Sequence, residues 1–213
     1  MDLRKIVTEN PILAVLRKVP FAHTIPMAGA ILSGGVSFFE VALNSERALE
    51  QISLLQSEFS GRAWIGAGTV RTAAMAAEAV RAGAQFLLTP CADEEVLAYC
   101  QENQIPLLPG ALTPTEISAC LRHGFSTIKL FPADAMPKGY VKNLKGPLDG
   151  TEYVAMGGVN AQNLLSFFQQ GYLGVGMGSS LLPKEAAAAG DWEACAGHVA
   201  SMLAQIQAWK GQK

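Results

Sequence analysis

The sequence has no apolar run long enough to span a membrane. Its uninterrupted apolar stretches fall far short of the roughly 18 residues that a membrane-spanning helix requires, although 50% of the chain belongs to the apolar residue types. The opening segment, MDLRKIVTEN, also lacks the apolar core and the small-residue cleavage site of a secretory signal. We therefore expect no membrane partner and a cytoplasmic location.

Cysteine and charge are also sparse. The four cysteines lie far apart, without a C-x-x-C pair or a histidine at zinc-ligand spacing, which predicts free thiols and no metal site. Charged residues make up 16% of the chain and leave a formal net charge of −2, with Lys and Arg scattered along it. A nucleic-acid-binding protein would show a basic patch. The composition thus gives no sign of a nucleic-acid partner and favours a small-molecule ligand.

The chain alternates short apolar runs with longer segments of helical periodicity, and no linker divides it, so we expect a single domain over residues 1–213. Eight runs are predicted as strands: Ile12–Arg17, Val36–Leu43, Ala63–Ala67, Gln85–Thr89, Ile105–Pro109, Ser126–Phe131, Tyr153–Met156 and Leu173–Met177. Eight repeats of strand and helix predict an α/β fold, a parallel sheet closed into a (β/α)8 TIM barrel. The alternative, an open doubly wound sheet, would place a G-x-G-x-x-G turn after the first strand, where this chain has Lys18-Val19-Pro20.

Glycines mark the predicted helix ends. Arg81–Gly83, Arg122–Gly124 and Gln169–Gly171 each combine a polar or basic last turn with a glycine just beyond the helix. Gln162–Gln170 and the long segment Ala188–Lys210 are expected as closing helices on the outside of the barrel.

Lys129 interrupts an apolar strand. The period of two places it on the face opposite Ile128 and Leu130. If those two residues pack under helices, Lys129 points into the barrel, where the loss of hydration disfavours its ammonium form and favours attack of the amine on a carbonyl. The alternatives are a side chain that extends to solvent and an exposed edge strand.

Glu40 has the same kind of placement between Phe39 and Val41. A carboxyl group in so apolar a strand suits proton transfer near neutral pH. The alternative is a structural ion pair, with Lys129 or Arg17 as its partner. Arg17, at the end of the first strand, is itself a candidate for binding a carboxylate, or a solvated strand end.

Glycine-rich turns follow the last two predicted strands, at Gly157-Gly158 and at 176–180. In phosphate-binding barrels the loops after the seventh and eighth strands hold the phosphate through backbone N–H groups, which predicts a phosphate site here. Glycines also serve tight turns for steric reasons. A further turn, Gly66–Thr69, ends the third strand and offers close backbone approach and a hydroxyl at the barrel mouth, or is a plain turn.

The strand-end segments resemble a known family. FFEVALNS, IGAGTV, FLLTPC, LLPGALTPTE, TIKLFPA, GGVN and GMGSSL follow one another in unbroken order from Ile12 to Leu182. Together they are similar to the class I aldolases of 2-keto-3-deoxy-6-phosphogluconate (KDPG) and 4-hydroxy-2-oxoglutarate (KHG). The resemblance implies a lyase that works without a cofactor or a metal, assembles as a homotrimer, and cleaves KDPG to pyruvate and glyceraldehyde 3-phosphate, or KHG to pyruvate and glyoxylate.

The resemblance also implies roles for individual residues. Lys129 matches the lysine that forms a Schiff base with the ketone, and Glu40 matches the general acid–base. Thr69 and Pro90 match residues that line the pyruvate pocket, and Phe131 matches an aromatic wall beside the lysine. The phosphate-binding positions of the family match Gly157, Gly158 and Ser179.

The chain departs from the gluconate-type pattern at two positions. Asn44 replaces an arginine that holds the carboxylate in many members, which leaves Arg17 as the candidate replacement. Met156 stands where many members have threonine, and a thioether cannot donate the hydroxyl hydrogen bond. Both features favour an alternative, the aldolase of the C4 epimer 2-keto-3-deoxy-6-phosphogalactonate. Two further alternatives are a barrel in which Lys129 acts only as a cation and a non-catalytic sugar-phosphate-binding barrel.

Overall fold

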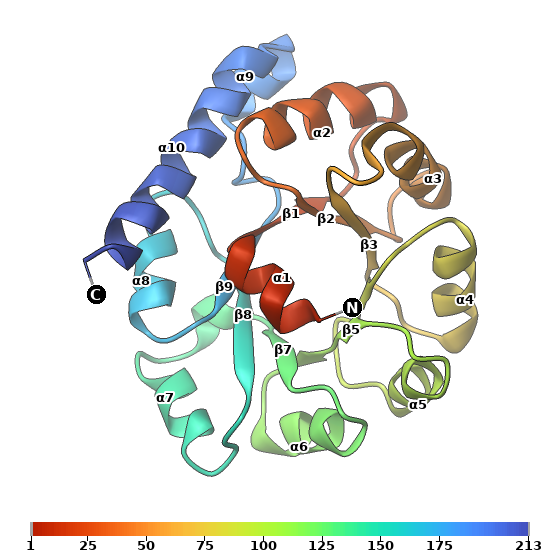
Figure 1. Cartoon of the computed structure of the whole chain (residues 1–213), viewed down its shortest axis with the longest axis vertical. Helices are drawn as coiled ribbons and strands as arrows, with labels where there is room; N and C mark the ends of the chain where they lie inside the picture. The colour runs from red at the N-terminus through yellow and green to blue at the C-terminus, as the bar shows by residue number, and fades with distance from the viewer. Residues whose placement is uncertain (1, 213) are drawn as a thin grey trace.

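The computed structural model describes residues 2–212 and contains one parallel sheet of nine strands with helices around it (Figure 1). The strands are β1 (Ile12–Leu16), β2 (Phe38–Ala42), β3 (Trp64–Gly68), β4 (Leu87–Leu88), β5 (Leu107–Leu108), β6 (Gly110–Ala111), β7 (Thr127–Leu130), β8 (Glu152–Met156) and β9 (Gly174–Met177). Each of the eight predicted strands overlaps an observed one. The predicted TIM barrel is confirmed.

The ninth strand arises where the ring closes. The sheet runs β5-β4-β3-β2-β1-β9-β8-β7-β6, so β5 and β6 are its two ends, and only Pro109 separates them in the chain. Proline has no N–H to donate to a ladder and interrupts the strand, but its carbonyl still accepts a hydrogen bond from the backbone N–H of Lys129, at 2.9 Å. The segment Leu107–Ala111 is therefore the fifth of eight barrel strands along the chain, in two pieces; it overlaps the predicted strand Ile105–Pro109 and continues two residues beyond it.

All helices of the described residues except α1 lie in a ring outside the strands (Figure 1). The helices are α1 (Leu3–Glu9), α2 (Thr24–Ser33), α3 (Ala48–Phe59), α4 (Ala73–Arg81), α5 (Glu94–Glu102), α6 (Pro114–Arg122), α7 (Tyr140–Lys145), α8 (Leu164–Gln169), α9 (Lys184–Ala189) and α10 (Trp192–Lys210), with 3-10 turns η1 (Phe21–His23) and η2 (Ala133–Ala135).

The glycine signals at the helix ends are confirmed. Gly83, Gly124 and Gly171 have φ of 103°, 82° and 92°, the left-handed conformation in which glycine carries no steric penalty. The expectation for Ala188–Lys210 is wrong in one respect, because this segment is not one helix. Gly190 (φ 70°) ends α9, and the Asp191 side chain then caps α10 by accepting from the Ala194 N–H at 3.0 Å.

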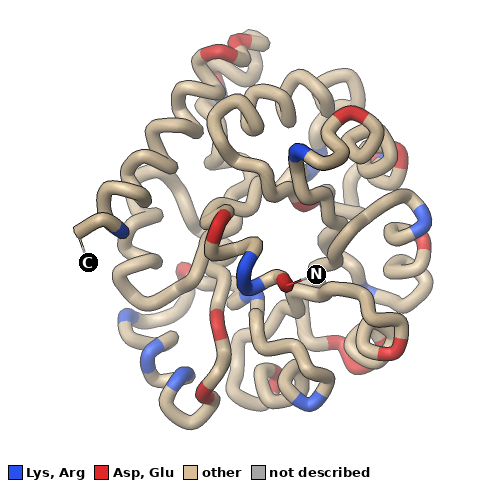
Figure 2. The backbone as a smooth tube through the Cα atoms, in the orientation of Figure 1, with Lys and Arg blue, Asp and Glu red and all other residues tan. Residues whose placement is uncertain are grey.

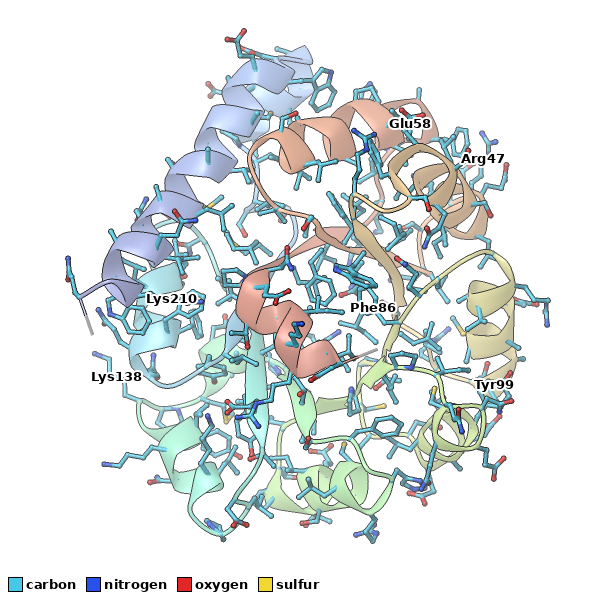
Figure 3. The ribbon with its side chains drawn as sticks, viewed as in Figure 1. Arg47, Glu58, Phe86, Tyr99, Lys138 and Lys210 are labelled. Atoms are coloured by element: carbon cyan, nitrogen blue, oxygen red, sulfur yellow. The ribbon has the colours of Figure 1, made fainter. Side chains whose placement is uncertain are left out.

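Two apolar layers result from the alternation along the strands. Phe39, Val41, Ile128 and Leu130 belong to the layer between sheet and helices, as predicted. A second, smaller layer fills the barrel interior, where Phe38 stacks on Phe86 with ring centroids 4.7 Å apart. Phe86 is labelled in Figure 3. The faces opposite the outer layer, which carry Glu40 and Lys129, therefore point into the barrel.

Helix α1 covers one end of the barrel (Figure 1). Leu3, Ile6 and Val7 are buried and pack against the interior layer. The end at which the strands start is thus filled with apolar side chains, and the carboxyl ends of the strands carry the accessible polar groups.

Charges of both signs are scattered over the outer helices and loops (Figure 2). Within residues 2–212, no helix has the length and hydropathy needed to cross a membrane.

Candidate active site

Lys129 lies on the inner face of β7 and is 4% exposed. Its register neighbours are Gly110 on β6 and Val154 on β8, neither of which offers a side-chain partner. The Nζ atom lies 5.5 Å from the centroid of the Phe131 ring. Because the side chain is buried, the expected inward orientation is confirmed and the alternative of a solvent-exposed side chain is wrong. The ammonium makes no hydrogen bond or ion pair among the described residues.

Glu40 is 0% exposed on β2, and neither carboxylate oxygen has a hydrogen-bond partner within the part of the chain that the structure describes. The structural ion pair with Lys129 or Arg17 is therefore absent in residues 2–212. An unpaired buried carboxylate costs on the order of several kcal/mol. Such an orphaned polar group is a mark of a functional site.

Residues 66–68 of the predicted turn Gly66–Thr69 are instead the end of strand β3, so the plain-turn alternative is wrong, and the missing side chain of Gly68 leaves room for Glu40. A Cβ atom built on Gly68 would overlap the Oε1 and Cδ atoms of Glu40, and one built on Gly66 would overlap the ring of Phe86. Gly68 faces Ala42 in the β2–β3 register and has no positive φ, so it is needed for space and not for backbone conformation. The close approach predicted for this turn is made by the carboxylate.

Three strand ends meet at Arg17. Its Nη1 donates to Asn44 Oδ1 at 3.3 Å, and its Nη2 donates to Thr69 Oγ1 at 3.4 Å. Thr69 has φ 61°, a left-handed conformation that is unfavourable for a β-branched residue and is typically found at functional sites. The guanidinium is exposed and has no carboxylate partner among residues 2–212.

These groups face one cavity of about 710 Å³ at the carboxyl ends of the strands. Nine of the ten residues predicted for the site line it: Arg17, Glu40, Thr69, Pro90, Lys129, Phe131, Gly157, Gly158 and Ser179. Asn44 does not line the cavity and reaches it only through its hydrogen bond to Arg17. Val15, Lys18 and Val159 line the cavity and were not predicted. Lys18 directly follows a strand end, which is the signal that could have identified it.

The aromatic and proline residues shape the mouth. Phe131 is 42% exposed beside Lys129. Pro90 follows Thr89, whose Oγ1 is buried and accepts a hydrogen bond from the Gly110 N–H at 2.9 Å. This hydrogen bond joins the residue after β4 to the first residue of β6 and so fixes the position of the neighbouring Pro90.

The predicted phosphate loops follow β8 and β9, and both line this cavity. Gly157 and Gly158 have φ of 96° and 70°, and the Gly158 carbonyl accepts from Asn163 Nδ2 at 2.8 Å. Ser180 Oγ donates to the Val159 carbonyl, whereas the Ser179 hydroxyl is exposed and has no partner in residues 2–212.

Asp134 of η2 was missed by sequence reasoning. A Cβ atom on Gly158 would overlap its carboxylate, so this side chain borders the glycine pair. No periodicity links Asp134 to the glycines, because the contact depends on how the loop after β7 folds over β8.

The cysteines are free, as predicted. Burial raises the pKa of Cys100 to about 11 and that of Cys120 to about 12, so both are inert thiols at neutral pH. Residues 2–212 contain no group of three His, Cys, Asp or Glu side chains arranged to hold a metal ion.

Relatives of known activity match nearly the whole chain. The KHG/KDPG aldolase of Escherichia coli K12 is 35% identical over 192 residues, which cover 88% of each chain. The 2-dehydro-3-deoxy-6-phosphogalactonate aldolase of the same strain is 32% identical over 175 residues, or 82% of this chain and 85% of the relative. Among solved structures, a Legionella pneumophila KDPG aldolase that holds pyruvate as a covalent carbinolamine intermediate is 28% identical, with a TM-score of 0.86 over 95% of this chain and 98% of that chain.

The sequence model of the family described as KDPG and KHG aldolase matches residues 3–197. The resemblance inferred from the strand-end segments is thereby confirmed. The relatives are aldolases, lyases that cleave a carbon–carbon bond, and this chain belongs to the KDPG and KHG aldolase family.

Proposed function

We propose that the chain is a Schiff-base aldolase that cleaves KDPG to pyruvate and glyceraldehyde 3-phosphate, KHG to pyruvate and glyoxylate, or both. One observation carries the proposal. A lysine and a carboxylate, 4% and 0% exposed, face the same cavity, and neither has a hydrogen-bond or ion-pair partner among residues 2–212. Two unpaired ionisable groups in an apolar barrel are costly to the fold and are the pair that imine chemistry needs.

Lys129 attacks the ketone carbon C2 of the substrate, and the resulting carbinolamine loses water to give the protonated imine. The C3–C4 bond then breaks, its electron pair moves into the enamine, and the C4 hydroxyl becomes the aldehyde as its proton passes to Glu40, directly or through a water. Protonation of the enamine at C3 and hydrolysis of the imine release pyruvate and restore the amine.

The substrate carboxylate is assigned to Arg17 and Thr69. A guanidinium binds a carboxylate through two parallel N–H···O bonds, and Arg17 is the exposed, uncompensated guanidinium of this cavity. Its hydrogen bonds to Asn44 and Thr69 fix its direction. Asn44 thus orients Arg17 and does not itself contact the substrate, because it lies outside the cavity lining.

The distal end of the substrate is assigned to Gly157, Gly158 and Ser179. Two adjacent glycines in left-handed conformation expose backbone N–H groups, and the free Ser179 hydroxyl adds a donor. A phosphate suits these donors, whereas the shorter KHG leaves them to water or to its own terminal carboxylate.

The aldolase of the C4 epimer, 2-keto-3-deoxy-6-phosphogalactonate, is the second candidate. It is favoured by Asn44, and by Met156, whose thioether lines the cavity where a threonine hydroxyl would donate a hydrogen bond. The galactonate relative at 32% identity adds to this case. Measuring kcat/KM for the two phosphorylated epimers separates the candidates, since a ratio above about tenfold for either one assigns the stereochemistry.

We further propose a homotrimer in the cytoplasm, the assembly and location that the resemblance to the family implies. Free cysteines suit a reducing compartment. Sedimentation of the purified protein measures the assembly, and a monomer at micromolar concentration would contradict it.

Release of pyruvate from KDPG and from KHG, followed in a coupled assay, tests the activity itself. The wild type is expected to cleave at least one of them, and Glu40→Gln is expected to lose about 10²- to 10⁴-fold in kcat, the range of general acid–base catalysis. A folded wild-type protein that releases no pyruvate from either acid or from the galactonate epimer would overturn the proposal.

A further inference from the structure

A second pocket of about 270 Å³ lies beside the substrate cavity, at the same end of the barrel. It is bounded by the loop after β1, the inner face of α2, the loop after β9 and helix α9. We call it the side pocket; it is lined by Val15, Leu16, Arg17, Lys18, Val19, Pro20, Met27, Ile31, Gly178, Ser179, Leu181, Leu182, Lys184 and Ala187.

The side pocket adjoins the substrate cavity. Val15, Arg17, Lys18, Gly178 and Ser179 line both. Gly178 has no side chain to close the junction, and a Cβ atom built on it would meet only Val15, at 3.8 Å. A ligand that occupies the substrate cavity near Ser179 therefore lies next to the side pocket.

The residues that line the side pocket indicate which kind of ligand group would bind there. Beyond the junction they are apolar except for Lys184, and no Asp or Glu lines the side pocket. Lys184 lines the side pocket and not the substrate cavity, and its side chain is exposed. A smaller apolar cavity of roughly 150 Å³ is enough to hold benzene, so the side pocket has room for an alkyl chain of several carbons, with the Lys184 cation in its wall.

We propose that the side pocket is an extended subsite for 2-oxo acids whose C4 carries an apolar chain that ends in a carboxylate. The inference rests on the proposed aldolase function and names a further substrate class for it. Cleavage follows the same path: the C3–C4 bond breaks, its electron pair stays on C3 in the enamine on Lys129, and the C4 hydroxyl loses its proton to Glu40. The products are pyruvate and an aldehyde with a terminal carboxylate, and the reverse reaction joins them.

The test is the condensation of pyruvate with aldehydes that differ only in the number of methylenes and in the end group, carboxylate or methyl. Each methylene that enters the side pocket is expected to raise kcat/KM for the aldehyde by about two- to fourfold. The carboxylate end is expected to add a further two- to fivefold or so at the length that reaches Lys184, because an exposed ion pair contributes modestly.

Two variants on the same helix provide the comparison. Ala187→Phe fills the side pocket and should remove the dependence on chain length, whereas Ala189→Phe, at an exposed position outside both cavities, should keep it. Lys184→Met should remove only the advantage of the carboxylate end. Met27→Trp fills the same pocket from α2 and serves if Ala187→Phe does not fold, as judged by circular dichroism.

Each preparation is also reduced with borohydride in the presence of pyruvate. An adduct on Lys129 without any rise of kcat/KM with chain length, or with equal slopes in Ala187→Phe and Ala189→Phe, overturns the side-pocket proposal alone. Equal rates for the two end groups at every chain length overturn the carboxylate assignment. Absence of the adduct overturns the proposed function instead.

Discussion

Gly68→Ala is expected to inactivate the protein by displacing Glu40. The new methyl group would occupy the position of the carboxylate, on a strand that is fully buried at this residue. Inserting one methyl into a filled interior costs about 1–3 kcal/mol of folding free energy. If Glu40 rotates away to relieve the overlap, kcat falls by the contribution of a general acid–base, about 10²- to 10⁴-fold.

Gly66→Ala is the matched control. It adds the same methyl group to the same strand two positions earlier, but the overlap is with the ring of Phe86, which belongs to the interior packing. Neither glycine has a positive φ, so both substitutions act through space alone. We expect similar losses of unfolding free energy from the two variants in urea titrations, and a large loss of kcat only from Gly68→Ala.

A second substitution tests whether the displacement of Glu40 causes the loss of kcat in Gly68→Ala. Glu40→Asp shortens the side chain by one methylene, so it should recover part of the kcat that Gly68→Ala removes, while it lowers the kcat of the wild type. A double-mutant cycle in kcat gives this coupling energy. Three results would each refute the assignment of Glu40 as the acid–base positioned against Gly68. They are near-normal kcat in Gly68→Ala, equal kcat losses in the two glycine variants, and additive effects in the cycle.

Three further predictions concern the remaining groups. Arg17→Met should raise KM for the 2-oxo acid by about 10- to 100-fold, since it removes charge-assisted hydrogen bonds to the carboxylate; unchanged KM in steady-state kinetics would exclude that contact. Ser179→Ala should weaken phosphorylated substrates more than KHG, and equal losses on both would argue against a phosphate contact. Burial raises the pKa of Cys100 to about 11 and that of Cys120 to about 12, from an ordinary 9.0, so the folded state favours the protonated thiols. The contribution of these two thiols to the unfolding free energy should therefore be constant below about pH 9 and fall above it, with a slope of up to about 1.4 kcal/mol per pH unit per thiol; urea titrations of Cys100→Ala that keep the full wild-type slope above about pH 9 would contradict this.

The barrel and its inward-facing charges could be predicted because they depend on local periodicity. Alternation alone separates Lys129 from Ile128 and Leu130, and the apolar outer layer then forces the lysine inward. The glycine ends of the helices follow equally local rules.

Features that depend on contacts between distant segments were not predictable. The split of the closing strand at Pro109, the contact of Asp134 with Gly158, and the position of Asn44 behind Arg17 all arise from register and loop paths. Asn44 was included among the substrate-binding candidates because it matches the family position of a carboxylate-binding arginine; in the structure it lies beyond the end of β2 and its side chain accepts a hydrogen bond from Arg17. The resemblance to the family identified the site positions but could not specify these contacts.

The measurement that tests the central claim most directly is mass spectrometry of the protein after reduction by borohydride in the presence of pyruvate. Reduction of an imine would leave a stable pyruvate-derived adduct, and peptide mapping locates it. We predict one adduct per chain, on the peptide that contains Lys129, and none in Lys129→Ala that remains folded. An unmodified wild-type protein, or an adduct that persists in Lys129→Ala, would contradict the assignment of Lys129 as the nucleophile.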